Sequence, residues 1–312
     1  MVTASGSILV AGAINTDLVA TMKRAPQAGE TVTGTSFATH GGGKAANQAV
    51  AVARSGERAS LVGAVGNDDF GRDRLSDLTR DGIETEWVMV NGRDPSGVAL
   101  ILVEDGGENR IACVPGATLA VPPDHVEAAV AALRPTFVLA TNELPHDTLI
   151  ALFSAARRAR IHVVFNATPD PEIARDLIEN VSTLIVNEGE AAVLLGREAT
   201  GNPRDAVTSL CKLGPETVVL TLGSQGVIVG SADRVAGYQP PKLTVVDTTG
   251  AGDTFCGAFI AELARGTRMN DAVRYAVRAS ALSVTRPGAQ SSIPMRDEVL
   301  AMSLMPDGSA SP

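Results

Sequence analysis

Short apolar runs that alternate with helical segments constrain the fold of this chain more than any other feature of its sequence. The apolar runs cover residues 7–14, 59–65, 136–141, 161–167, 183–187, 217–223 and 226–230. Segments with a helical spacing of apolar residues cover 44–55, 71–81, 123–133, 147–159, 188–195, 203–213, 253–265 and 270–285. Strands that are apolar throughout need cover on both faces, as in a parallel sheet between layers of helices. We therefore predict an α/β fold with a doubly wound, mostly parallel sheet and a ligand site beyond the carboxyl ends of its strands.

Two stretches interrupt this rhythm. Residues 16–39 alternate like a half-exposed strand with no helix after it, and residues 95–113 have the pattern of a hairpin that turns at 105–107. Together we expect them to form a small antiparallel sheet, which projects as a lid over the ligand crevice. On this division the α/β domain consists of residues 1–15, 40–94 and 114–304, and residues 305–312 form a disordered tail.

Composition narrows the classes of protein and of partner. The chain has 312 residues, of which 45% are hydrophobic but only 3% aromatic, so the core must consist of aliphatic side chains. The formal charge of −9 argues against nucleic acid and anionic membrane as partners. Three cysteines without a C-x-x-C pair fit a reducing cytoplasm. The sequence shows neither a signal peptide nor a run of about 20 apolar residues, so we expect a cytoplasmic protein.

The stretch "VVDTTGAGDTFCGAF", residues 245–259, combines small residues with a carboxylate at a helix start. A strand-like segment, 243–246, leads into Gly250, Ala251 and Gly252, and a helix is expected to begin at or near Asp253. Bare backbone and free first-turn amides make a site for phosphate or developing negative charge. Asp253 is either a stabilising N-terminal carboxylate, which the helix dipole keeps ionised, or the base that accepts a proton from a hydroxyl attacking phosphorus.

The stretch "HGGGKAANQAVAVARSG", residues 40–56, also sets glycines before a helix. It is not a Walker A loop, because Ala45 stands where Ser or Thr is required. Gly41, Gly43 and Ala46 match the looser dinucleotide fingerprint, with Asp68 as the ribose-binding acid, so a dinucleotide-dependent oxidoreductase is one interpretation. A polyol site is the other, because several fixed donors and acceptors suit a sugar's hydroxyls. Its polar groups would be Asn15, Asp17, Lys44 and Asn47.

With both stretches in hand, the chain resembles the sugar kinases of the ribokinase (PfkB) family. "GGGKAANQAVAVARSG" is similar to the family's N-terminal signature and "DTTGAGDTFCGAF" to its C-terminal one. Counterparts of "GAINTD", "GAVGNDDFG", "NEGEAAVLLG" and "TLGSQGV" extend the resemblance nearly from end to end. It implies the fold predicted above, a homodimer formed through the lid, and transfer of the γ-phosphoryl group of ATP to the primary hydroxyl of a pentose, first of all D-ribose.

The resemblance also implies roles for single residues. Asp253 would be the catalytic base, and the peptide groups of Gly250, Ala251 and Gly252 would stabilise the phosphoryl charge. The sugar hydroxyls would be held by Asn15, Asp17, Gly43, Lys44, Asn47 and Glu143. The nucleotide would contact Asn187, Thr221, Gly223, Gly226 and Gly252, with Glu190 near Mg²⁺ that arrives on ATP. An activating monovalent cation, K⁺, would be bound by Asp247, Thr249, Ser283, Arg286, Gly288 and Ser292.

Three departures from the family pattern keep the choice of substrate open. Ala45 replaces the usual glycine after the signature lysine, Thr118 stands where Asn is common, and Asn142 stands where an apolar residue is frequent. Another sugar, such as a ketohexose or deoxyribose, or a nucleoside therefore remains an alternative acceptor. Outside the kinases, the oxidoreductase above and a sugar-sensing pseudo-kinase are the remaining alternatives.

Overall fold

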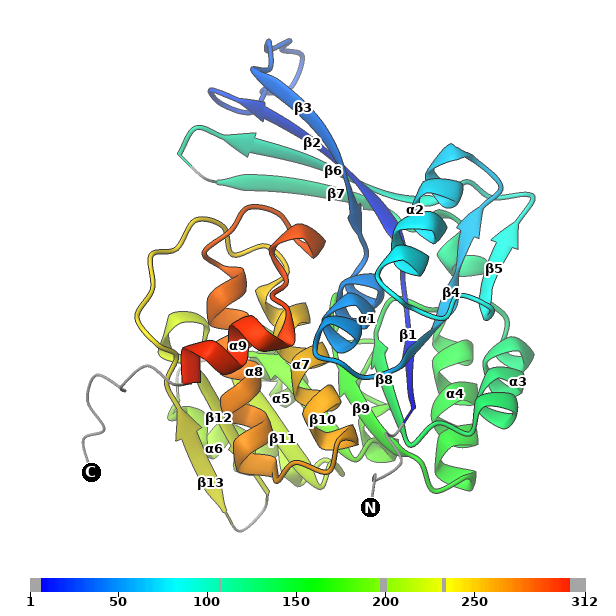
Figure 1. The fold of residues 1–312 in the computed structure, drawn as a ribbon, viewed down its shortest axis with the longest axis vertical. Helices are drawn as coiled ribbons and strands as arrows, with labels where there is room; N and C mark the ends of the chain where they lie inside the picture. Colours follow the sequence, from blue (N-terminus) through cyan, green and yellow to red (C-terminus); the bar gives the residue numbers. More distant parts are fainter. Residues whose placement is uncertain (1–6, 107, 197–200, 232–233, 304–312) are drawn as a thin grey trace.

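A nine-stranded sheet forms the centre of the molecule (Figure 1). The computed structural model describes residues 7–106, 108–196, 201–231 and 234–303, and the predicted disordered tail lies outside them. The strand order is β13-β12-β11-β10-β9-β8-β1-β4-β5, and all neighbours from β11 to β5 run parallel. Only β12 and β13 at one edge are antiparallel. The predicted α/β fold class is confirmed.

Seven of the nine sheet strands coincide with the apolar runs of the sequence, and the two edge strands, β5 and β13, lie outside those runs. Their bounds are β1 (Ile8–Ala11), β4 (Ala59–Gly66), β5 (Val88–Asn91), β8 (Phe137–Thr141), β9 (His162–Asn166), β10 (Thr183–Asn187), β11 (Thr217–Thr221), β12 (Val227–Gly230) and β13 (Val235–Tyr238). All residues of β1 and β4 are buried, and β8 to β11 are buried except at residues near their ends. Such runs fit only the interior of a sheet that helices cover on both faces.

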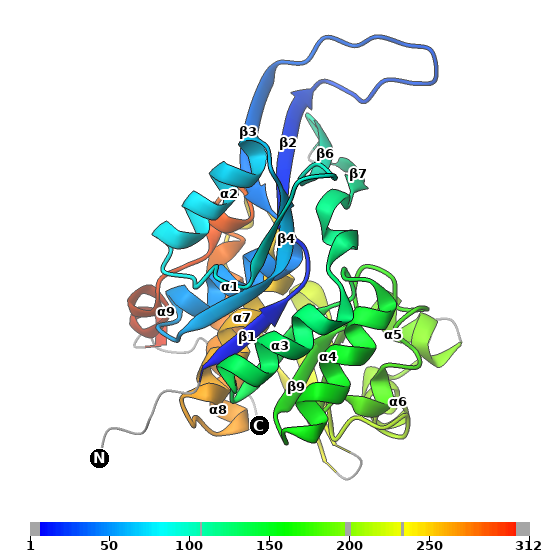
Figure 2. The same cartoon turned by 90° about the vertical axis from the view of Figure 1, so that its right-hand side faces the viewer.

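Helices fill both faces of this sheet (Figures 1 and 2). One apolar cluster joins it to α1 (Lys44–Arg54), α2 (Asp69–Arg80), α7 (Ala251–Ala264), α8 (Met269–Ser283) and α9 (Arg296–Ser303). The opposite cluster joins it to α3 (Pro123–Leu133), α4 (His146–Arg158), α5 (Glu188–Leu195) and α6 (Pro203–Cys211). None of the helices in the described residues combines the length and apolar character needed to cross a membrane.

A second sheet of four strands, the lid sheet, projects from the main body (Figures 1 and 2). Its order is β3 (Ser36–Gly42), β2 (Asn15–Met22), β6 (Gly97–Glu104) and β7 (Asn109–Val114). The outer pairs are antiparallel, as expected for the hairpin, whereas the central pair of β2 and β6 is parallel. This parallel pair arises because β2 and β6 enter the lid in the same direction, with Asn15 beside Gly97. The lid strands also extend past the predicted segments, since β3 runs through Gly42.

The sequence prediction was wrong in the region before α7. Residues 243–246 form no strand; Leu243, Val245 and Val246 are exposed, and the chain instead touches the end of α8 through a bond from Val246 N to Val284 O of 2.7 Å. Among the described residues, no strand lies beside this apolar segment to pair with it. Helix α7 begins two residues before Asp253, and neither β13 nor α9 was predicted.

Candidate active site

The carboxyl ends of the parallel strands bring most of the predicted site residues to one edge of the sheet. Asn15 follows β1, Glu143 follows β8, Asn187 ends β10 and Thr221 ends β11. Helix α7 begins at the same edge, where its residue Asp253 contacts α1. This is where an open α/β sheet binds its ligands.

Asp253 lies in the first turn of α7 and is only 8% exposed. Its Oδ2 accepts a hydrogen bond of 2.9 Å from Nδ2 of Asn47, and its Oδ1 accepts one of 3.0 Å from Nε2 of Gln48. Burial raises the pKa of Asp253, while the charge of Lys44 and the two amide bonds act in the opposite direction. The net effect is a raised pKa. We had expected the helix dipole to favour the ionised form, and burial outweighs that effect. A raised pKa makes the carboxylate a stronger base.

The start of α7 has open backbone beside Asp253. Gly250 caps the helix in the left-handed conformation, with φ of 72°, and no side chain caps the first turn. Within the described residues, the amides of Gly252 and Asp253 have no hydrogen-bond acceptor. A Cβ added to Gly252 would meet nothing within 4 Å. Free amides at the positive end of a helix fit a phosphate group.

Two amide oxygens, one at the start of β2 and one in the first turn of α1, are buried without partners in the described part of the chain. Asn15 is 5% exposed and Asn47 6% exposed, yet the Oδ1 atoms of both lack a hydrogen bond in the described part of the chain. Asn15 donates only a long bond of 3.6 Å to Sγ of Cys113 on β7. Buried polar atoms are nearly always paired, so these two oxygens need a ligand or water as donor. A sugar hydroxyl meets this need.

Asp17 faces this site from the lid sheet. Its pKa is raised to about 6, chiefly by burial and also by Asp253, against the charges of Arg74 and Lys44. A Cβ at Gly42 would lie 2.1 Å from Oδ1 of Asp17, so only glycine leaves room for the carboxylate there. Asp17 thus lies within electrostatic reach of Asp253 and Lys44, and its contact with the sugar stays a prediction.

The carboxylate of Glu143 is hydrogen-bonded to backbone amides and to one hydroxyl of the protein. Its carboxylate accepts the amides of Ala13, Lys44 and Ala45 at 2.9, 3.2 and 3.3 Å, and the hydroxyl of Thr141 at 2.7 Å. It thus caps helix α1 from another strand. The predicted sugar contact of Glu143 stays a prediction, and its main observed partners are backbone amides.

Gly43 is the N-cap of α1, and Lys44 is the first residue of that helix. Burial lowers the pKa of Lys44, but the carboxylates of Asp253, Glu143 and Glu190 raise it overall, so the ammonium stays charged. Gly43 has φ of 88°, and a Cβ there would lie 2.4 Å from the carbonyl of Ala13. Glycine therefore allows α1 to start directly against the loop after β1.

The predicted nucleotide residues lie at the ends of β10 and β11. Asn187 and Glu190 form a capping box at the start of α5, with both bonds at 2.8 Å. Burial raises the pKa of Glu190, partly offset by the bond from Asn187, by Thr168 and by Lys44. Within the described residues, no cluster of three His, Cys, Asp or Glu side chains could hold a metal ion. Glu190 near Mg²⁺ therefore stays a prediction.

The glycines after β11 have a structural reason of their own. Gly223 and Gly226 have φ of 55° and 93°, and a Cβ at Gly226 would lie 2.0 Å from the carbonyl of Tyr238. The hydroxyl of Thr221 is 3.4 Å from the carbonyl of Val186 on β10. These contacts shape the turn between β11 and β12, and the role of the three residues in nucleotide binding stays a prediction.

The predicted cation residues gather beside the start of α7. Asp247 accepts the amide and hydroxyl of Thr249 at 2.9 and 2.6 Å and the amide of Gly288 at 2.8 Å. Burial would raise the pKa of Asp247, but these bonds outweigh it and lower the pKa. Ser283 and Ser292 are fully buried, and their hydroxyls donate to nearby carbonyls. The side chain of Arg286 pairs with Glu298, which leaves its carbonyl as the predicted ligand.

Sequence reasoning missed Gln48. It is fully buried, and its Nε2 donates to both Asp253 and Oδ1 of Asn166, at 3.0 and 3.1 Å, while its Oε1 has no partner in the described chain. The available signal was a pair of adjacent amides, Asn47 and Gln48, in a helix otherwise rich in Ala and Val. Two amides at successive helix positions can hold both oxygens of one carboxylate.

The three departures from the family pattern lie in different surroundings. Ala45 is fully buried with its amide on Glu143. Thr118 lies in the short helix Gly116–Ala120, and its buried hydroxyl has no partner among the described residues. The side chain of Asn142 donates to the carbonyl of Asp170. The unpartnered hydroxyl of Thr118 is a reason to test other sugars.

The dinucleotide interpretation of residues 41–46 does not fit. Gly41 lies in strand β3 of the lid sheet, and the first amides of α1 are already occupied by Glu143. Asp68 is the N-cap of α2; it accepts the amide of Gly71 and both the amide and hydroxyl of Ser96. The supposed ribose-binding acid is thus a structural cap.

Comparisons with known proteins agree with this geometry. The model of the pfkB family carbohydrate kinase matches residues 5–296. The chain is 39% identical over 306 residues to ribokinase of Schizosaccharomyces pombe, covering 94% of this chain and 96% of that one. It is 36% identical over 294 residues to ribokinase of Bacillus subtilis, covering 94% and 98%. The solved structure of Arabidopsis thaliana ribokinase complexed with ribose and ATP matches with a TM-score of 0.88 at 29% identity, covering 97% of this chain and 100% of that one. The chain therefore belongs to the pfkB family of carbohydrate kinases and is a phosphotransferase that acts on a sugar.

Proposed function

We propose that this protein transfers the γ-phosphoryl group of ATP to the primary hydroxyl of D-ribose, forming ribose 5-phosphate. The observation that carries the proposal is the pairing of a buried carboxylate, Asp253, with the two free amides at the start of the same helix. The ribokinases among its relatives and the ribose and ATP of the Arabidopsis complex support the choice of substrates.

The carboxylate of Asp253 and the free amides would act on different reactants of the phosphoryl transfer, the carboxylate on the sugar hydroxyl and the amides on the γ-phosphoryl group. The hydroxyl oxygen of the sugar forms a bond to the γ-phosphorus, while the bond from that phosphorus to the bridging oxygen breaks and ADP leaves with the electron pair. Asp253 accepts the hydroxyl proton as the new bond forms, and its pKa, raised by burial, favours that transfer. The amides of Gly252 and Asp253 stabilise the charge on the phosphoryl oxygens.

The remaining predicted residues position the two substrates. We infer that the unpaired oxygens of Asn15 and Asn47, the carboxylate of Asp17 and the Lys44 ammonium bind sugar hydroxyls beside Gly43. Glu143 fixes α1 and offers a further acceptor. On the phosphate side, Lys44 lies near Glu190, and the turn of Thr221, Gly223 and Gly226 lies at the neighbouring strand end. Mg²⁺ would neutralise phosphate charge, and the carboxylate of Glu190 and the amide of Asn187 would help to hold it.

A monovalent cation such as K⁺ fits the segment before α7 as an activator. Asp247 stays ionised there because its pKa is lowered, and its two oxygens tie residues 247–249 to Gly288. Carbonyls of Thr249, Ser283, Arg286 and Gly288, with the hydroxyl of Ser292, would complete the ligands. Such an ion would stiffen the loop that holds the free amides of α7.

The lid sheet supports a homodimer. Large apolar side chains on its strands are exposed: Phe37, Leu100, Ile111 and Val114 are between 47% and 68% accessible. Exposed apolar groups gathered on one small sheet are typical of an interface. We place the dimer in the cytoplasm, which suits the three free cysteines, and we take the α/β body, within the predicted boundaries, as its catalytic part.

A coupled ADP-release assay tests the function. Purified protein is given Mg-ATP with a panel of pentoses, deoxyribose, ketohexoses and nucleosides, with and without K⁺. We expect the largest kcat/KM with D-ribose. Faster turnover of another panel member would reassign the substrate, and the absence of turnover on every member would support a sugar-sensing protein instead.

A further inference from the structure

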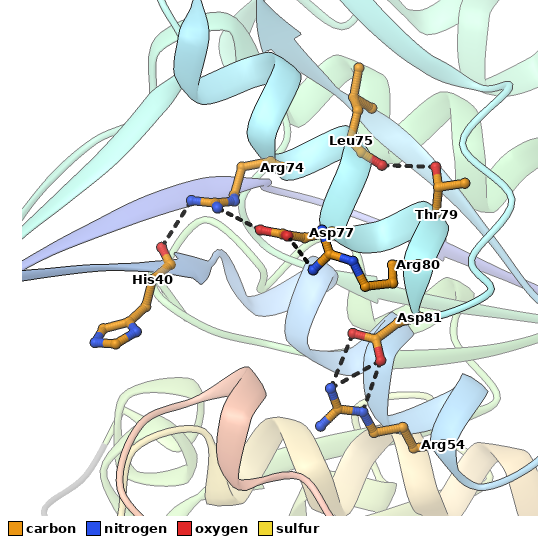
Figure 3. Close-up of polar contacts among 8 residues, drawn as sticks. All are labelled: His40, Arg54, Arg74, Leu75, Asp77, Thr79, Arg80 and Asp81. Carbon is orange, nitrogen blue, oxygen red and sulfur yellow. Dashed lines mark hydrogen bonds and ion pairs between the residues drawn. The ribbon is translucent and has the colours of Figure 1, made fainter.

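A buried arginine on α2 links the main body to the root of the lid sheet (Figure 3). Arg74 is only 8% exposed. Its Nη1 donates to Oγ1 of Thr16 on β2 at 3.1 Å and to the carbonyl of His40 on β3 at 3.2 Å. Its Nη2 pairs with Asp77 one turn further along α2 at 2.6 Å. One guanidinium therefore holds β2 and β3 together at the ends where they join the main body.

These contacts are made by the two residues next to Asp17 in the lid sheet. Thr16 is its neighbour along β2, and His40 is its partner in the register with β3. Successive side chains on a strand point to opposite faces, so Arg74 grips one face of β2 while Asp17 projects from the other. No hydrogen bond joins Arg74 and Asp17 in the described structure. Their interaction is therefore one of charge and of backbone position.

The charges around Asp17 come from several elements. Arg74 of α2 and Lys44 of α1 favour its ionised form, whereas Asp253 of α7 opposes it. The charge of Asp17 raises the pKa of the nearby Cys113 thiol on β7. His40 of β3 pairs with Asp17 in the register of the lid sheet. The charge of Arg74 opposes the effect of burial on Asp17 more strongly than the charge of Lys44 does. Asp77, which pairs with both Arg74 and Arg80, is more exposed than Arg74.

We propose that Arg74 is a positioning residue of the sugar site, which fixes the root of the lid and keeps the carboxylate of Asp17 charged for sugar binding. This inference rests on the proposed function for the part that assigns Asp17 to the sugar. An ionised carboxylate accepts hydrogen bonds from hydroxyls, so sugar affinity is present above the pKa of Asp17 and is lost as the pH falls through it. Removal of the Arg74 charge raises that pKa, and the loss then begins at a higher pH.

The test compares Arg74→Met and Arg74→Lys with the matched control Arg80→Met. Arg80 lies on the same helix and pairs with the same Asp77 at 2.9 Å, but its side chain is 73% exposed, and among the described residues it has no bond to the lid. For each variant, sugar KM and kcat are measured between pH 5 and 9. The Asp17 carboxyl is also titrated by carbon NMR in the free protein, assigned with Asp17→Asn.

We expect Arg74→Met to move the acid limb of kcat/KM and the NMR titration of Asp17 upward by about half to one pH unit. Sugar KM at pH 6.5 should rise several-fold, with a smaller change in kcat. Arg74→Lys should restore much of the titration but not the full affinity, since it keeps the charge and loses the fork that holds two strands. Arg80→Met should change neither.

Two outcomes would overturn the proposal: an unchanged Asp17 titration in Arg74→Met, or an equal shift in Arg80→Met. If Arg74→Met does not fold, Thr16→Val still tests the positional part, and an unchanged sugar KM there would contradict it. The NMR titration does not depend on which sugar is the substrate. Failure of ribose turnover in the unchanged protein would therefore reject the proposed function and leave the Arg74 result readable.

Discussion

Helices α1 and α7 start alike in sequence and differ in what occupies their first turns. Each follows a glycine with positive φ, Gly43 at 88° and Gly250 at 72°. The first amides of α1 are bound by the carboxylate of Glu143, and the next by the carbonyls of Ala13 and Gly43. The start of α7 has no such anion, and two of its amides stay free within the described residues.

This difference separates a structural cap from a ligand site. The N-terminus of any helix attracts negative charge. The fold decides whether a side chain of the protein or a bound ligand supplies that charge. At α1 it is resident, because β8 ends beside the helix and delivers Glu143. At α7 the nearest carboxylate, Asp253, is turned toward Asn47 and Gln48 of α1. The amides are thereby left for a visiting anion.

The largest expected effect is that of Asp253→Asn. It removes the proton acceptor and keeps the shape of the side chain, but the new amide has one acceptor oxygen and can keep only one of the two bonds from Asn47 and Gln48. We expect kcat to fall by about 10²- to 10⁴-fold with sugar KM changed little. Steady-state kinetics with circular dichroism as a folding control checks this. A large loss of sugar affinity with kcat intact would assign Asp253 to binding instead.

Gly252→Ala sharpens the comparison, because it should act on stability and activity in opposite directions. The added Cβ meets no protein atom within 4 Å, and alanine favours a helix by up to about 1 kcal/mol. We therefore expect equal or higher stability in urea. The methyl group would crowd the free amides, so kcat/KM for ATP should fall roughly tenfold to a hundredfold. Unchanged kinetics would show that the phosphate lies elsewhere.

Glu143→Gln is the corresponding change at α1, and its effect should be on stability. The neutral amide is a weaker acceptor for three backbone amides and the Thr141 hydroxyl. We expect a loss of about 1–2 kcal/mol in the free energy of unfolding, measured in urea. Thr141→Val, which removes a single donor, should cost less. If Glu143→Gln lowers kcat strongly at unchanged stability, Glu143 acts on substrate and the contrast with α7 fails.

The smallest effect is expected at Asp247, which does not contact the free amides but holds the loop that precedes them. Asp247→Asn should lower kcat only several-fold and weaken its response to K⁺, because the loop before α7 loses an ionised tether to Thr249 and Gly288. Kinetics in K⁺ and in a bulky organic cation at equal ionic strength checks this. An undiminished response to K⁺ in the variant would move the cation site away from Asp247.

Most strands and helices could be predicted from the sequence. The predictions that were wrong or missing concern contacts between segments distant along the chain. Buried strands and amphipathic helices matched their predicted ranges within a few residues, because local periodicity reports burial directly. The apolar segment 243–246 misled the prediction, since it has the composition of a strand but no strand of the described residues lies beside it. The parallel pairing of β2 with β6 joins segments about 80 residues apart, which no local pattern encodes.

The sequence by itself determined the class of fold, the two glycine-rich helix starts and the identity of the acid near the second of them, because these depend on neighbouring residues. Only the tertiary structure decided which helix start keeps its amides free, that Gln48 holds the second oxygen of Asp253, and that Arg74 reaches the root of the lid. These contacts join residues distant along the chain. Their strength depends on burial and on charge, which arise only when the elements pack together.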